Sequence, residues 1–94
     1  MDIKEIIRAK RGTIIDVRTP EEFRGGHVAG SVNISLQELP HRMEELKKLP
    51  APLVLCCASG SRSSRANRFL REHQLECGDG GSWMDVNYLL SQTE

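Results

Sequence analysis

The sequence predicts an α/β fold with three layers, in which a central parallel sheet is flanked by helices. Short apolar runs alternate along the chain with segments of helical periodicity, and this alternation is typical of parallel sheets. The run 53–57 is apolar without polar alternation, as expected of a strand that is buried on both faces. Ninety-four residues suit one hydrophobic core, so we expect a single domain over residues 1–94.

The expected elements follow one another without a repeat or a low-complexity linker. In chain order they are a helix over 2–10, a strand over 13–17, a helix over 20–24, a loop with a short strand over 26–34, a helix start at 35–38, a helix face over 43–49, a strand over 53–57, a helix from 62 to about 73, a short strand over 75–77, a glycine-rich turn over 78–81 and a helix from 83 onward.

Four polar residues mark the starts of helices. Asp2, Thr19, Ser35 and Ser82 each precede a segment of helical periodicity, and their side chains can accept hydrogen bonds from the first free backbone N–H groups. Thr19 and Ser35 are each followed three residues later by a glutamate, which is the spacing of a capping box. We therefore expect helices to begin directly after these four residues.

The loop after the strand 53–57 has the composition of an anion-binding site. Residues 58–61 are Ala, Ser, Gly and Ser, small enough for their backbone N–H groups to turn toward one point. A helix follows, and its N-terminus presents unpaired N–H donors and the positive end of the helix dipole. A cysteine at the mouth of such a loop has a low pKa and is largely a thiolate. Cys57 is therefore a candidate nucleophile.

Composition and charge argue against several function classes. The formal net charge is zero, and the arginines that follow the loop lack the interleaved aromatic residues of a nucleic-acid site. We expect no membrane partner, because no stretch approaches membrane-spanning length and the N-terminus has no apolar signal region. Three cysteines, two of them adjacent, make a poor disulfide framework and favour a reducing, cytoplasmic location. The cysteine and histidine spacing does not fit a metal site.

Four motifs resemble those of the rhodanese sulfurtransferases, in the order of that family. Residues 57–63 are similar to its active-site loop Cys-x-x-Gly-x-Arg-Ser, and 16–18 to its Asp-x-Arg strand end. Residues 26–34 are similar to its Gly-His-x-x-Gly-x-x-Asn-Ile segment. Residues 80–83 are similar to its Gly-Gly pair before a tryptophan, although the family's usual spacing there is slightly longer. The family's short first strand has little or no room here.

The resemblance implies a sulfurtransferase that works by two-step covalent catalysis. Cys57 would take a sulfane sulfur from a small anionic donor such as thiosulfate, and cyanide, a thiol or an acceptor protein would remove it. No cofactor or metal is implied. The residues that the resemblance assigns to substrate binding are Ala58, Ser59, Gly60, Ser61, Arg62 and Ser63.

Four further residues each have more than one possible role, and two of them, Asp16 and Arg18, are expected to support the active-site loop. Asp16 can orient the loop or cap a turn, and both interpretations stay open. For Arg18 we expect an ion pair with Asp16 or Glu22 rather than a contact with the substrate. For His27 we expect a hydrogen bond to the backbone rather than acid–base catalysis, and Cys77 is expected to be a buried strand residue.

Two other functions remain open. Phosphatases and arsenate reductases of the same fold use a loop of the form Cys-x5-Arg, and Cys56 to Arg62 fits that spacing. One more loop residue would widen the cradle from a single sulfur to a tetrahedral oxyanion. Gly60, three residues after Cys57, and Ser63, directly after Arg62, favour the sulfurtransferase frame. A non-catalytic binding module is the other alternative, and the retained cysteine argues against it.

Overall fold

The computed structural model describes residues 1–92, in which strands and helices alternate along the chain. Its elements are α1 (Ile3–Arg8), β1 (Thr13–Asp16), α2 (Pro20–Arg24), β2 (Val32–Asn33), the 3₁₀ helix η1 (Leu36–His41), α3 (Met43–Lys47), β3 (Leu53–Cys57), α4 (Ser61–Glu72), β4 (Cys77–Ser82) and α5 (Trp83–Ser91). The four strands form one parallel sheet in the order β2-β1-β3-β4. The predicted α/β class with a central parallel sheet is confirmed.

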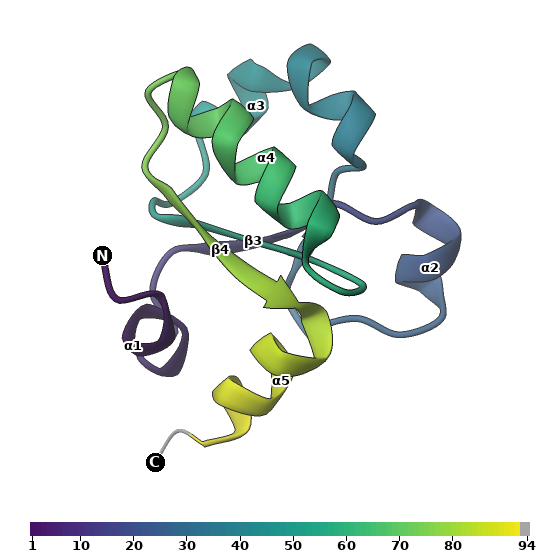
Figure 1. The fold of residues 1–94 in the computed structure, drawn as a ribbon, viewed down its shortest axis with the longest axis vertical. Helices are drawn as coiled ribbons and strands as arrows, with labels where there is room; N and C mark the ends of the chain where they lie inside the picture. The colour runs from purple at the N-terminus through teal and green to yellow at the C-terminus, as the bar shows by residue number, and fades with distance from the viewer. Residues whose placement is uncertain (93–94) are drawn as a thin grey trace.

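Helices cover both faces of the sheet and bury a separate core on each (Figure 1). Successive side chains of a strand point to opposite faces, so β3 contributes to both cores. Leu53, Leu55 and Cys57 pack in the core beneath η1, α3 and α4, whereas Val54 and Cys56 pack in the core beneath α1 and α5. The two adjacent cysteines therefore lie on opposite faces of the sheet.

Three of the four expected helix caps are present. Asp2 and Ser82 accept hydrogen bonds from the backbone N–H groups of Glu5 and Met84, at 3.3 and 3.1 Å. Thr19 forms both halves of a capping box at the start of α2. The capping box expected at Ser35 is wrong: its hydroxyl donates to the Arg18 carbonyl oxygen at 3.0 Å and makes no cap contact.

The glycine-rich segment 78–81 is part of strand β4, not the turn that we expected. Two of its glycines are required by neighbours rather than by a turn. A Cβ atom on Gly78 would lie 2.6 Å from Cδ1 of Ile3, and one on Gly80 would lie 2.9 Å from Cγ2 of Val86. Gly80 has no room for a side chain because the Leu55 carbonyl oxygen also lies 3.0 Å from that position, whereas at Gly78 the end of the Ile3 side chain would have to move aside. Asp79 pairs with Leu55 of β3 and Gly81 with Cys56, so the register between the two strands shifts by one residue at Gly80.

The first helix ends at Arg8, earlier than expected, and Lys10 then adopts a left-handed conformation with φ of 56°. In the part of the chain that the structure describes, no strand precedes α1, in keeping with the missing first strand noted above. Within residues 1–92, none of the helices combines the length and the apolar character needed to cross a lipid bilayer.

Candidate active site

Cys57 is the last residue of β3, at the carboxyl edge of the sheet, and the loop that follows turns directly into α4. Ligands of parallel α/β sheets bind at this edge. Gly60 precedes the first residue of α4 with φ of 106°, a left-handed conformation that favours glycine. This conformation turns the loop back on itself, so that the start of α4 lies next to the Cys57 side chain.

Backbone N–H groups converge on the sulfur of Cys57. The amide of Gly60 donates to Sγ at 3.0 Å and the amide of Ser63 at 3.3 Å. These amides are free to do so because the first N–H groups of a helix have no partner within it. Cys57 itself is only 1% exposed, so the sulfur lies at the base of the loop.

The environment of Cys57 favours the thiolate. Burial by itself would raise the pKa of Cys57, but hydrogen bonds from the Ser63 hydroxyl and from the amides of Ser63, Gly60 and Ser59 outweigh it and lower the pKa. Charged hydrogen bonds of this kind are stronger than neutral ones. No hydrogen bond to Sγ comes from Ala58, Ser61 or Arg62 among the described residues.

Asp79 also belongs to the site, although it was not among the residues that the sequence predicted. The Ser63 hydroxyl lies 3.5 Å from the Cys57 sulfur and 2.7 Å from Oδ1 of Asp79, which also accepts the Gly81 amide at 2.9 Å. The hydroxyl has one proton, so the sulfur and the carboxylate compete for it. Asp79 was missed because residues 78–81 were expected to form a turn. No local signal in the sequence places this segment in the sheet beside β3.

Arg62 does not point at the sulfur in this structure. Its two terminal nitrogens donate to the two carboxylate oxygens of Glu22, at 2.8 and 2.9 Å. The pKa of Arg62 is raised chiefly by this hydrogen-bonded pair. Arg62 thus forms an ion pair with α2 at the rim of the loop, and the contact with a substrate that we expected for it stays a prediction.

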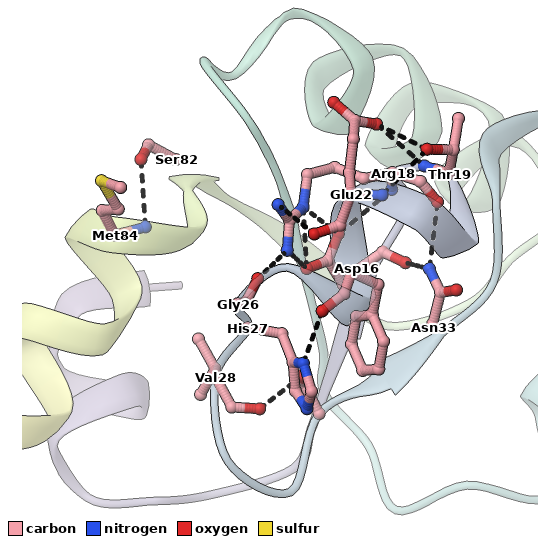
Figure 2. A network of polar contacts seen from close by, with 12 residues as sticks. Asp16, Arg18, Thr19, Glu22, Gly26, His27, Val28, Asn33, Ser82 and Met84 are labelled. Carbon is pink, nitrogen blue, oxygen red and sulfur yellow. Dashed lines mark hydrogen bonds and ion pairs between the residues drawn. The ribbon is translucent and has the colours of Figure 1, made fainter.

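Asp16 and Arg18 form the ion pair that we expected (Figure 2). Nε and Nη2 of Arg18 donate to the Asp16 carboxylate at 2.9 and 2.8 Å, and Nη2 also donates to the Gly26 carbonyl oxygen at 2.7 Å. The guanidinium lies over the ring of Trp83, 4.9 Å from its centroid. Both charged residues are buried, at 0% and 4% exposed. Their network braces the turn after β1 beside the site.

The other cysteines and His27 are set apart from this chemistry. Burial raises the pKa of Cys56 to about 12 and also raises the pKa of Cys77. Cys77 is a buried strand residue, as expected. Nδ1 of His27 contacts the carbonyl oxygen of Phe23 at 2.7 Å, and its ring stacks on the Phe23 ring, so this histidine binds to the backbone as expected.

A cavity of about 650 Å³ opens elsewhere, between α1, α5 and the loop after α2. Its lining includes Ile14, Val28 and Asn87 but no residue of the loop 57–63. This cavity is therefore separate from the cysteine loop.

Fold and site together define an α/β protein with a cysteine at the carboxyl edge of its sheet, whose sulfur accepts hydrogen bonds from backbone amides of the loop that follows. Residues 2–87 match the family model described as a rhodanese-like domain. The chain belongs to the rhodanese-like domain family.

Relatives with assigned names include sulfurtransferases. Thiosulfate sulfurtransferase GlpE of Shewanella oneidensis is 30% identical over 88 residues, which cover 88% of this chain and 86% of that protein. The uncharacterized protein YqhL of Bacillus subtilis is 41% identical over 64 residues, which cover 68% of this chain and 50% of that protein. The chain thus matches only half the length of YqhL.

Solved structures agree on the fold. A rhodanese-related protein from Thermoplasma volcanium superposes with a TM-score of 0.76 at 30% identity, covering 99% of this chain and 89% of that one. The human single-domain sulfurtransferase TSTD1 superposes with a TM-score of 0.68 at 22% identity, covering 98% and 93%. The second likeness is evidence of fold alone.

Proposed function

We propose that the protein is a sulfurtransferase that moves a sulfane sulfur from a donor such as thiosulfate to a thiophilic acceptor, through a persulfide on Cys57. The observation that carries this proposal is the convergence of the Gly60 and Ser63 amides on the Cys57 sulfur. Relatives named as thiosulfate sulfurtransferases support the same class of reaction.

In the first half-reaction, the Cys57 thiolate attacks the outer sulfur of thiosulfate. The sulfur–sulfur bond of the donor breaks, a new one forms on Cys57, and sulfite leaves with the electron pair. The outer sulfur of the persulfide is negatively charged, and we assign its stabilisation to the backbone of residues 58–63. In the second half-reaction, cyanide or a thiolate takes the outer sulfur and regenerates the Cys57 thiolate.

The neighbouring charged residues support this chemistry in different ways. Arg62 can contact the anionic end of the donor only when its guanidinium leaves Glu22, which holds it in the free protein. Asp16 and Arg18 support the site indirectly, because their ion pair holds the turn after β1 in place. The acceptor can be a small thiol, cyanide or the thiol of another protein. All three cysteines are free, which suits a reducing compartment, so we also propose a cytoplasmic location.

A phosphatase or arsenate reductase that uses the Cys-x5-Arg loop from Cys56 to Arg62 has less support. It would require Cys56 to be the nucleophile, yet this residue is 0% exposed, faces the core beneath α1 and α5, and has a pKa raised to about 12 by burial. Nucleophilic attack needs the thiolate, which is scarce at such a pKa.

The test is intact-protein mass spectrometry after thiosulfate treatment and again after cyanide, with hydrolysis of an aryl phosphate assayed in parallel. We expect one added sulfur that peptide mapping places on Cys57 and that cyanide removes. Cys57→Ser should lose both the added sulfur and thiocyanate formation, whereas Cys56→Ser should keep them. Aryl phosphate hydrolysis lost only in Cys56→Ser would favour the phosphatase frame, and no modification at all would favour a binding module.

A further inference from the structure

The carboxylate of Glu22 is held at the rim of the proposed active site by four contacts. It accepts the backbone N–H and the hydroxyl of Thr19 at 2.9 and 3.1 Å (Figure 2), and both terminal nitrogens of Arg62 at 2.8 and 2.9 Å. The hydrogen-bonded Arg62 and the Thr19 backbone lower the pKa of Glu22 to about 2. Glu22 is therefore ionised at neutral pH, and the capping box fixes its position.

The ion pair with Glu22 occupies the two terminal nitrogens of Arg62, which are the groups that would bind an anionic donor. An arginine binds a carboxylate or another oxyanion best through two parallel N–H donors, and both terminal nitrogens of Arg62 already face Glu22. The pair is part-buried, with side chains 30% and 36% exposed, so water screens it only in part. A donor that needs Arg62 must compete with a carboxylate that is already in place.

Arg18 offers no replacement. Its guanidinium is buried and donates to the Asp16 carboxylate, to the Gly26 carbonyl oxygen and to the Glu22 carbonyl oxygen. The two ion pairs therefore cancel in charge. Asp79, which contacts Ser63, and the Cys57 thiolate are left as two negative charges beside the incoming sulfur. The N-terminal end of α4 adds a positive partial charge at the same loop.

We infer that Glu22 is a specificity-determining residue, which withholds Arg62 from the donor and so favours sulfane sulfur donors with one negative charge over dianions such as thiosulfate. The inference rests on the proposed sulfur transfer. Its physical basis is that a dianion meets more like-charge repulsion than a monoanion at this loop and gains more from a freed guanidinium.

Two donors that differ in charge but share the reaction test this role. Methanethiosulfonate anion carries one charge where thiosulfate carries two. The Cys57 thiolate takes its outer sulfur to form the same persulfide, and methanesulfinate leaves with the electron pair. The measurement is kcat/KM for each donor, with cyanide as acceptor, in wild type and in Glu22→Gln. Glutamine can still accept the Thr19 amide, so the cap of α2 is retained.

We expect Glu22→Gln to raise kcat/KM for thiosulfate about tenfold, the size of one charge-assisted contact, and for methanethiosulfonate by less than about threefold. Glu21→Gln, which removes an exposed carboxylate next along α2, should change neither value. Adding Arg62→Gln to Glu22→Gln should abolish the gain. An equal change for both donors, or a fall for thiosulfate, would overturn the inference.

A measurement on the wild-type protein is independent of how the variant folds. Because salt screens repulsion between like charges, kcat/KM for thiosulfate should rise with ionic strength, and more steeply than for methanethiosulfonate. A fall with salt would show that the site attracts dianions and would contradict the role of Glu22. If neither donor adds sulfur to Cys57, the proposed function itself fails, whereas a persulfide with unchanged donor preference rejects this inference alone.

Discussion

The Ser63 hydroxyl links the Cys57 sulfur to a carboxylate, and this link limits how acidic the thiol becomes. The hydroxyl helps to lower the pKa of Cys57, but it lies 3.5 Å from the sulfur and only 2.7 Å from Oδ1 of Asp79, so the sulfur and the carboxylate compete for its one proton. The same carboxylate helps to raise the pKa of Cys56, after the larger effects of burial and Asp16. Asp79 thus opposes the backbone amides of the loop.

We predict that Asp79→Asn lowers the pKa of Cys57. Asparagine keeps an acceptor for Ser63 and Gly81 but removes the negative charge that disfavours a thiolate. Titration of the ultraviolet absorbance of the thiolate measures this pKa, with Cys57→Ser as the blank. Asp85→Asn, at an exposed position in the first turn of α5, is the matched control. An unchanged or higher pKa in Asp79→Asn would mean that the charge of Asp79 does not reach the sulfur.

At the scale of elements, α2 is joined to α4 by the pair of Glu22 and Arg62, which lie 40 residues apart in the chain. The pKa of Glu22 is depressed from 4.5 to about 2 in the folded protein, chiefly by Arg62. A group of this kind stabilises the fold fully above its unfolded pKa, and the contribution is lost as the pH falls through the folded pKa.

We therefore predict that the stability gap between wild type and Glu22→Gln is greatest at neutral pH and closes as the pH falls from about 4.5 to about 2. Urea midpoints measured across this range give the gap directly. Glu21→Gln should follow the wild type at every pH, because its exposed carboxylate is outside the ion pair. A gap that stays constant with pH would show that Glu22 acts through packing alone.

At the scale of the whole molecule, β3 joins the two cores because its side chains alternate between them. We predict that Leu55→Ala, at a fully buried position of one core, lowers the free energy of unfolding by about 2–5 kcal/mol. Trp83, the one tryptophan in the chain, packs against the other core and reports on it by fluorescence.

Unfolding followed by Trp83 fluorescence and by far-ultraviolet circular dichroism should give coincident curves in both wild type and Leu55→Ala. Conservative Leu55→Met, which nearly keeps the side-chain volume, should cost less than about 1.5 kcal/mol. Fluorescence that survives after the dichroism signal is lost would show that the two cores unfold independently.

Local signals in the sequence were enough to predict the fold class, most element positions and the place of the cysteine loop. The capping box at Thr19, the apolar strand 53–57 and the small residues after it act within a few positions, so a reader of the chain can find them. The alternation of strands and helices along the chain predicts the parallel sheet, and this sheet places the end of β3 at the edge where ligands bind.

The remaining features were decided by contacts between distant segments. Residues 78–81 belong to a strand because they pair with β3, a contact between distant segments that no local pattern reveals. Arg62 faces Glu22 because the fold brings these two side chains within reach of each other, although they are far apart in the sequence. Sequence therefore determined where the thiolate lies, and tertiary structure decided which charges surround it, because electrostatic energy depends on distance in space.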